Sequence, residues 1–271
     1  MSGKLSILYH AVAFVVVAIW GSTFVFTKLL LLGGLTPAQI FVLRFVIAYL
    51  MLLVFCLWRG IRWVSDSWKD ELLMVLLGLT GGSLYFLTEN SSMNYTTTTN
   101  TSLIVSLCPL VATALISLFY KSQRLNRRQT VGSLMAAVGV ALVVMNGHFV
   151  LHLSPLGDVL AFSAALCWAV YSLLMIPVNR KYDTLFITRK VFFYGLLTMI
   201  PYFIWRPGLG IHLLVQQPEL VWNLLFLGCV ASMLCFLAWN WVLKKLGAVV
   251  ATNYVYFNPV TTIIFAWLIL H

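Results

Sequence analysis

Long runs of apolar residues, separated by short polar segments, divide the chain from end to end. A helix needs roughly 20 consecutive apolar residues to cross the hydrocarbon layer of a bilayer. Nine runs are of about that length: 9–31, 37–57, 71–91, 98–119, 128–146, 157–178, 184–205, 220–241 and 247–270. The pattern predicts an all-α membrane protein, a polytopic helical bundle with nine spans.

The composition agrees with a chain that is solvated mainly by lipid. Of its 271 residues, 62% are hydrophobic and 9% are charged, whereas a soluble domain has about half apolar and about a quarter charged residues. The net charge is +10. In so apolar a chain this charge favours the inner face of a membrane over nucleic acid, so we expect a lipid bilayer as a partner and no nucleic acid.

The basic residues are distributed unevenly between the expected loops. With a cytoplasmic N-terminus, 14 of the 17 Lys and Arg residues fall at inner loops or inner span ends, and Arg206 alone falls outside. Lys28 and Arg44 lie within spans. Such a bias sets the orientation of inner-membrane proteins. We therefore expect a multi-pass protein of the cytoplasmic membrane with its N-terminus in the cytoplasm.

An internal repeat relates the two halves of the chain. Segment 77–121 aligns with 227–271 without a gap, so that Asn90 matches Asn240 and Pro109 matches Pro259. A repeat unit of five spans turns the second copy upside down, and inverted repeats are typical of secondary transporters. We expect a first five-helix repeat over 1–150 and a second over 151–271. We expect the second repeat to stop after its fourth helix, without the tenth helix of the pattern.

Three charged residues lie well inside the expected spans, where charge is costly and often functional. Lys28, Arg44 and Glu89 share the outer third of the bilayer if each residue rises about 1.5 Å. We expect Glu89 to pair with Arg44 or Lys28 in a site that opens to substrate or to protons. The alternative is a structural ion pair in which Lys28 reaches the membrane interface.

Polar and aromatic residues near mid-span prolines are further candidates for substrate binding or translocation. Pro109 and Pro259 free backbone carbonyls, which membrane helices tolerate beside protein or a water-filled cavity. Helix–helix packing is the alternative role. The remaining candidates are Trp20, Asn90, Trp168, Tyr171, Asn240, Asn253, Tyr254 and Asn258.

No enzyme chemistry is evident in the sequence. The five cysteines lie in apolar stretches without metal-ligand spacing. No nucleophile–base pair is recognisable. We expect no metal, no cofactor and no catalytic activity.

Several stretches together resemble a known family. They are "AIWGSTFVFTKLLL", followed by "TPAQIFVLRFVIAYL", then "CPLVATALISLFY" and "RLNRRQTVGSLMAAVGVALVV". The chain resembles the drug/metabolite transporter superfamily, EamA type. That resemblance implies ten helices in two inverted five-helix repeats, with the fifth and tenth peripheral, and export of amino acids or other small metabolites.

The resemblance also extends to single positions. The positions that match the family are Trp20, Lys28, Arg44, Pro109 and Pro259. Two positions depart from it, because Gln123 and Asn258 stand where the family often has acidic residues. Mechanistic inferences that rest on those carboxylates do not carry over to this chain.

These observations favour a secondary transporter of small-molecule metabolites that works by alternating access. We expect efflux of amino acids or related solutes, with proton coupling through Glu89 as an open possibility. The alternatives are a non-transporting membrane subunit or sensor, and a truncated, inactive transporter. The sequence leaves the oligomeric state open.

Overall fold

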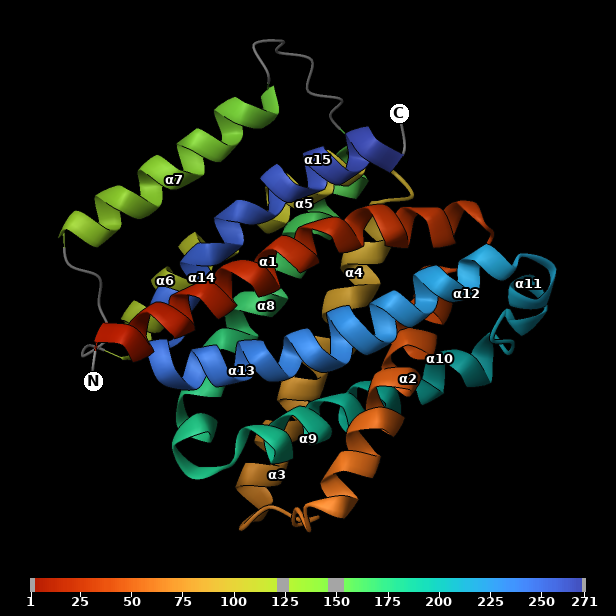
Figure 1. The fold of residues 1–271 in the computed structure, drawn as a ribbon, viewed down its shortest axis with the longest axis horizontal. Coiled ribbons are helices and arrows are strands. Elements are labelled where there is room, and N and C mark those ends of the chain that lie inside the picture. Colours follow the sequence, from red (N-terminus) through yellow and green to blue (C-terminus); the bar gives the residue numbers. More distant parts are fainter. Residues whose placement is uncertain (1–2, 121–126, 146–153, 270–271) are drawn as a thin grey trace.

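A computed structural model describes residues 3–120, 127–145 and 154–269, and all regular elements in these ranges are helical (Figure 1). The first half contains α1 (Gly3–Leu32), α2 (Pro37–Trp58), α3 (Trp68–Gly78), η1 (Leu79–Ser83), α4 (Leu84–Ser92), α5 (Thr98–Val105), α6 (Cys108–Phe119) and α7 (Arg127–Met145). The second half contains α8 (Pro155–Lys181), α9 (Thr184–Leu197), α10 (Ile200–Trp205), α11 (Ile211–Gln216), α12 (Pro218–Leu225), η3 (Phe226–Leu234), α13 (Cys235–Leu246), α14 (Ala248–Thr252), η4 (Asn253–Phe257) and α15 (Asn258–Ile269).

The chain is a multi-pass membrane protein. Seven helical stretches in the described residues are long and apolar enough to cross a bilayer: Ile7–Leu32, Pro37–Trp58, Trp68–Ser92, Thr98–Phe119, Pro155–Lys181, Pro218–Leu246 and Ala248–Ile269. They coincide with seven of the nine expected spans.

The other two expected spans differ from this pattern. The span expected at 184–205 is divided into α9 and α10, and Pro201 stands at the start of α10, where a missing N–H is tolerated. The span expected at 128–146 corresponds to α7. Nine spans therefore remain a prediction. Gln123 and the expected boundary between residues 150 and 151 lie outside the described residues.

Local sequence signals account for several helix ends. Thr36 and Gln39 form a reciprocal capping box at the start of α2, with Pro37 in the first turn. Gly34 precedes it with φ of 95°, a backbone conformation that glycine adopts without strain. The α1–α2 turn is thus specified by four neighbouring residues.

The element boundaries reproduce the repeat of the sequence. Helices α5 and α6 begin at Thr98 and Cys108, and 150 residues later α14 and α15 begin at Ala248 and Asn258. The π-helical segment η1 likewise falls within η3 after the same shift. The two halves of the chain therefore carry helix interruptions at corresponding positions, 150 residues apart.

The two halves of the chain interlock. Helix α1 packs on α13 and α15, α8 packs on α4 and α6, and α2 packs on η3 and α9 (Figure 1). In the same view α7 lies at the margin of the bundle. The helices of the two halves therefore pack against each other in the interior of the protein.

Candidate functional site

A cavity lies between the two halves of the chain. Its free volume is about 30 Å³, room for about one or two water molecules, and eight elements contribute to its walls. Its lining residues are Trp20, Thr23, Phe24, Arg44, Tyr85, Phe86, Glu89, Val105, Trp168, Phe236, Val255 and Asn258. The structure thus brings together five of the residues expected at the site: Trp20, Arg44, Glu89, Trp168 and Asn258.

Arg44 is a buried cation on the wall of this cavity, with 1% of its surface exposed. Its Nε donates a hydrogen bond to Ser232 Oγ at 2.9 Å, and its guanidinium lies 4.5 Å from the centre of the Phe86 ring. Its Nη1 is buried without a hydrogen-bond partner. A buried donor without a partner is costly, so Nη1 is suited to an acceptor on a ligand.

Glu89 also lines this cavity. It does not form the expected ion pair. Its carboxylate accepts a hydrogen bond from the Tyr85 hydroxyl at 2.5 Å. Among the described residues it lies within ion-pair distance of neither Arg44 nor Lys28. Lys28 instead donates to the Met93 carbonyl at 2.6 Å, at the C-terminal end of α4, where the helix dipole favours a cation.

Aromatic rings form the apolar walls. Trp20 meets Trp168 edge-on with ring centres 5.3 Å apart, and Phe236 lies 5.7 Å from Trp168. Trp20 is fixed in orientation, because its Nε1 donates to the Ala231 carbonyl at 3.0 Å. Such walls suit an apolar group held between aromatic faces.

Asn258 supplies an acceptor to the cavity. It begins α15 directly after the 3₁₀ segment η4, and 4% of its surface is exposed. Its Oδ1 is buried without a hydrogen-bond partner. The cavity therefore offers one unpaired donor, on Arg44, and one unpaired acceptor, on Asn258.

Asn90 and Asn240 lie outside the cavity lining and hold helices together. Asn90 Nδ2 donates to the Pro37 carbonyl at 3.3 Å. Asn240 accepts from the Tyr171 hydroxyl at 2.6 Å and donates to Thr188 Oγ1 at 2.9 Å. In each repeat the paired asparagine thus joins the third span to the beginning of the second.

The remaining expected residues also lie outside the lining. Tyr254 shares a hydrogen bond of 2.6 Å with His10 Nδ1, and Asn253 accepts one from Ser133 at 3.1 Å. Pro109 and Pro259 are buried in the first turns of α6 and α15, directly after the helix interruptions there. Their part in translocation stays a prediction.

Sequence reasoning missed several residues that line the cavity, including Tyr85 and Phe86. Tyr85 and Glu89 are four residues apart, a spacing that places them on one helix face, and this was an available signal. No comparable local signal marks Phe236 or Ser232, which approach the cavity from the other half of the chain.

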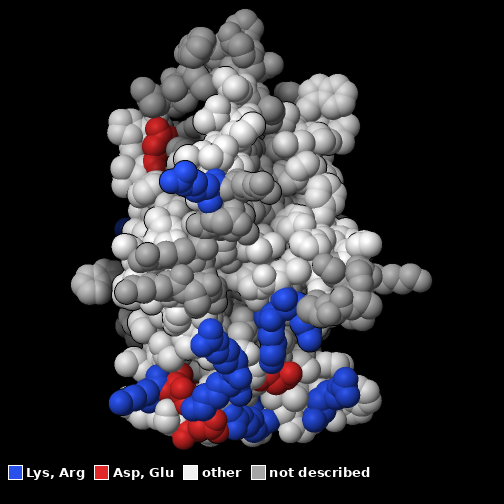
Figure 2. All heavy atoms as spheres, turned by 90° about the vertical axis from the view of Figure 1, so that its left-hand side faces the viewer, with Lys and Arg blue, Asp and Glu red and all other residues white. Residues whose placement is uncertain are grey.

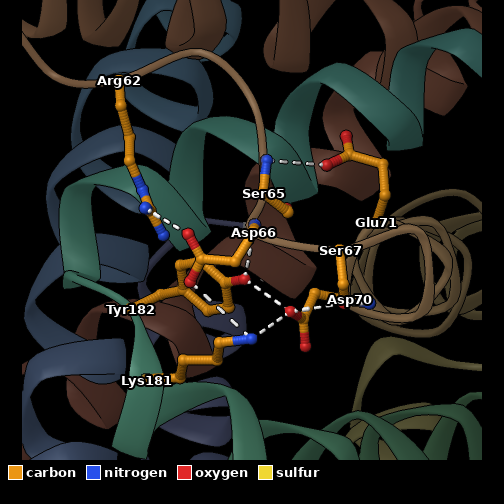
Figure 3. A network of polar contacts seen from close by, with 8 residues as sticks. All are labelled: Arg62, Ser65, Asp66, Ser67, Asp70, Glu71, Lys181 and Tyr182. Carbon is orange, nitrogen blue, oxygen red and sulfur yellow. Dashed lines mark hydrogen bonds and ion pairs between the residues drawn. The ribbon is translucent and has the colours of Figure 1, made fainter.

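A network of charged and polar side chains joins the two halves at one end of the bundle, which we call the basic end (Figure 3). Lys181 forms ion pairs with Asp70 and, at 3.6 Å, with Asp66. The Tyr182 hydroxyl donates to Asp70 at 2.7 Å and accepts from the Asp66 backbone N–H at 2.9 Å. The hydrogen bond from Arg62 lowers the pKa of Asp66, so this carboxylate stays charged at neutral pH.

Helix α9 extends this network. Lys190 and the Tyr194 hydroxyl both contact the Glu71 carboxylate. Arg189 donates to the Ile61 carbonyl at 3.2 Å and to that of Arg62. Figure 2 faces the side where α1 begins and shows Lys and Arg side chains gathered with carboxylates over its lower part.

The opposite end of the bundle is joined by hydrogen bonds and by an apolar cluster in which Leu30, Leu35 and Ile40 pack with Leu220, Leu224 and Leu227. Gln39 donates to the Gly208 carbonyl at 2.9 Å, and Asn100 donates to Asp158 at 2.7 Å. Of the four ion pairs between described residues, three join the halves, and all three are at the basic end. In the same part of the chain, no three His, Cys, Asp or Glu side chains are grouped as metal ligands.

Comparison with known proteins identifies the chain's relatives. A transporter from Archaeoglobus fulgidus with no assigned substrate is 30% identical over 261 residues, which are 95% of this chain and 88% of that protein. A probable terminal-alkyne amino-acid exporter from Streptantibioticus cattleyicolor is 24% identical, over 74% of this chain and 66% of its own length.

The fold also resembles that of a solved crystal structure. The two superpose with a TM-score of 0.72 at 19% identity, over 96% of this chain and 88% of the other. The model of the EamA-like transporter family matches residues 7–145 and again 155–271. On these matches, which cover nearly its whole length, the chain belongs to the EamA-like transporter family.

Proposed function

We propose that this protein exports small amphipathic metabolites, amino acids or related solutes, across the cytoplasmic membrane. The observation that carries this proposal is the cavity between the halves, where the unpaired Nη1 of Arg44 and Oδ1 of Asn258 stand among aromatic rings. Substrate sites of secondary transporters lie at such interfaces between repeats.

The side chains around the cavity favour a solute with one carboxylate and one hydrogen-bond donor, such as an ammonium group. A carboxylate would accept a charge-assisted hydrogen bond from Arg44. An ammonium would donate to Asn258, and an apolar side chain would lie against Trp20 and Trp168. The name of the Streptantibioticus relative, an amino-acid exporter, supports this substrate class.

We further propose an inverted repeat with halves 1–150 and 151–271. The two separate matches to the family model and the recurrence of helix interruptions at an offset of 150 residues support it. Helix α7 then serves as the fifth span, and α9 with α10 serves as the seventh. From the positive-inside rule we propose that the basic end and the N-terminus face the cytoplasm.

Alternating access then follows from relative motion of the halves. Ion pairs hold the halves together at the basic end, and hydrogen bonds with a cluster of buried apolar side chains hold them together at the opposite end. Both ends are therefore held by contacts between the halves, and loading from the cytoplasm requires the ion pairs to separate.

Efflux from cells that overproduce the chain tests this function. The medium is profiled by mass spectrometry and compared with that of cells carrying an Arg44→Leu, Glu89→Gln double variant at equal membrane levels. We expect one class of metabolite to be enriched only by the unmodified chain. Identical profiles would reject the exporter and favour a non-transporting subunit or sensor.

A further inference from the structure

A second pocket lies within the second half of the chain, at the basic end. It has a free volume of about 140 Å³ and lies between the end of α8, the end of α13 and the start of α14. Its lining residues are Met175, Ile176, Asn179, Arg180, Leu243, Lys244, Gly247 and Ala248. None of them lines the central cavity.

The pocket and the central cavity lie along the same two helices, α8 and α13. On α8, Trp168 lines the cavity and Met175 lines the pocket, and on α13 the corresponding residues are Phe236 and Leu243. Seven residues separate each pair, which is two turns or about 10 Å along a helix.

A hydrogen-bonded layer occupies the intervening level. Tyr171 is fully buried and donates to Asn240, which in turn donates to Thr188 on α9. Trp239, also fully buried, lies beside them on α13. The pocket and the cavity are therefore two compartments on one line, separated in this conformation by this layer.

The repeat gives the pocket a counterpart at the opposite end. Shifting Leu243 and Ala248 back by 150 residues leads to Met93 and Thr98, at the end of α4 and the start of α5. That region directly follows Glu89, which lines the central cavity. In an inverted repeat, a path along α4 and α5 at one end has its equivalent along α13 and α14 at the other.

The polar groups of the pocket match those of the central cavity in kind. Arg180 and Lys244 supply cations at its exposed rim. Lys244 Nζ donates to the Tyr182 carbonyl at 3.0 Å, and an ammonium group has two further N–H donors for a ligand. Asn179 has 9% of its surface exposed, and its Oδ1 is buried without a hydrogen-bond partner. The pocket therefore offers cationic donors and one unpaired acceptor, as Arg44 and Asn258 do in the cavity.

We propose that this pocket is the cytoplasmic loading site, where a solute that carries both a carboxylate and an ammonium group binds before it reaches the central cavity. The carboxylate binds between Arg180 and Lys244, and the ammonium donates to Asn179. The proposal rests on the proposed function, because it assigns a first binding station to the same transport path.

The kinetic test uses inside-out membrane vesicles, in which the cytoplasmic end faces the medium. The probes are the radiolabelled proteinogenic amino acids, tested singly. An Arg180→Gln, Lys244→Gln double variant is expected to raise KM about twofold to fivefold with little change in kcat, since exposed charge interactions contribute modestly. Lys245→Gln removes an adjacent cation that does not line the pocket, and its KM should stay unchanged.

A labelling test addresses the same site without transport. Ile176→Cys places a thiol in the pocket wall, and a membrane-impermeant maleimide should label it from the cytoplasmic side above the level of the unmodified chain. A mixture of the transported amino acids should slow that labelling. If the double variant does not accumulate in the membrane, the single variant Arg180→Gln replaces it in the kinetic test.

The outcomes separate the two proposals. If the unmodified chain transports amino acids while the double variant keeps its KM and Ile176→Cys stays unlabelled, the loading site is wrong and the exporter stands. If the unmodified chain transports none of them, the amino-acid function fails. An equal rise of KM in Lys245→Gln would also overturn the loading site, because a general surface charge would then explain the effect.

Discussion

At the scale of single residues, Arg44 shows how a buried charge is held for a ligand. Ser232 positions its Nε, Phe86 covers its guanidinium face, and its Nη1 is left without a partner. Only part of its hydrogen-bonding capacity is therefore satisfied by the protein. This arrangement differs from a structural ion pair, in which the partner carboxylate would occupy Nη1.

Arg44→Leu is expected to lower kcat/KM for transport about tenfold to hundredfold, the equivalent of losing a hydrogen bond to a charged group. Initial rates in vesicles with equal amounts of protein measure this loss. Ser232→Ala keeps the cation and should have a smaller effect. If Arg44→Leu only reduces the amount of protein in the membrane, with normal activity per molecule, Arg44 is structural.

Glu89 is the candidate for proton coupling, because its carboxylate lines the cavity and, within the described part of the chain, accepts a side-chain hydrogen bond from Tyr85 alone. If Glu89 carries the coupled proton, Glu89→Gln removes the pH dependence of the transport rate. Tyr85→Phe removes the hydrogen bond but keeps the carboxylate, so its rate should still depend on pH. A pH profile of Glu89→Gln that matches the unmodified chain would exclude this role.

At the scale of helices, close contacts between small residues determine how the two halves meet. A Cβ added to Gly21 of α1 would lie 1.7 Å from Thr261 Oγ1 and 2.6 Å from the Asn258 carbonyl oxygen of α15. Helices in a bilayer associate through such packing, because lipid is as apolar as their side chains. The same crossing of α1 and α15 therefore positions Asn258 in the cavity.

Gly21→Ala is expected to destabilise the folded protein by about 1–3 kcal/mol, as overpacking of a tight interior does. Thermal unfolding in detergent measures this as a lower Tm. Gly132→Ala is a matched control, because Gly132 is also helical and a Cβ there would meet nothing within 4 Å. An equal loss in both variants would mean that the α1–α15 crossing is not the cause.

At the scale of the whole molecule, charge is distributed unequally between the two ends of the bundle. The ion pairs that join the halves are concentrated at the basic end, and they differ in exposure. Lys190 and Glu71 have side chains that are 10% and 16% exposed, whereas Lys181 is 45% exposed. The buried pair should therefore contribute most to closure of this end.

Lys190→Ala leaves the Glu71 carboxylate largely buried without its cation, which should cost about 1–3 kcal/mol of stability. Lys181→Ala removes a solvent-screened partner and should cost less than about 1 kcal/mol. Thermal unfolding of both variants at the same ionic strength compares them. A lower Tm for Lys181→Ala than for Lys190→Ala would show that burial does not determine the strength of this network.

Local patterns in the sequence determined seven of the spans and the helix beginnings at prolines. The length of an apolar run and the position of a proline act on a few neighbouring residues, so Pro37, Pro109 and Pro259 mark helix beginnings without knowledge of the fold. The depth of Arg44 and Glu89 in their spans likewise follows from counting residues. Both residues were therefore predicted at the site, and both line the cavity.

The tertiary structure alone decided which faces of these helices meet. In a bilayer the lipid-facing and protein-facing sides of a helix are both apolar, so the sequence pattern does not orient the helix about its axis. For this reason the sequence left open whether Glu89 pairs with Lys28, which donates to the Met93 carbonyl instead. Asn90 and Asn240 were expected at the site but hydrogen-bond neighbouring helices outside the cavity lining. The contact of Arg44 with Ser232, 188 residues away in the chain, depends on the packing of α2 against η3.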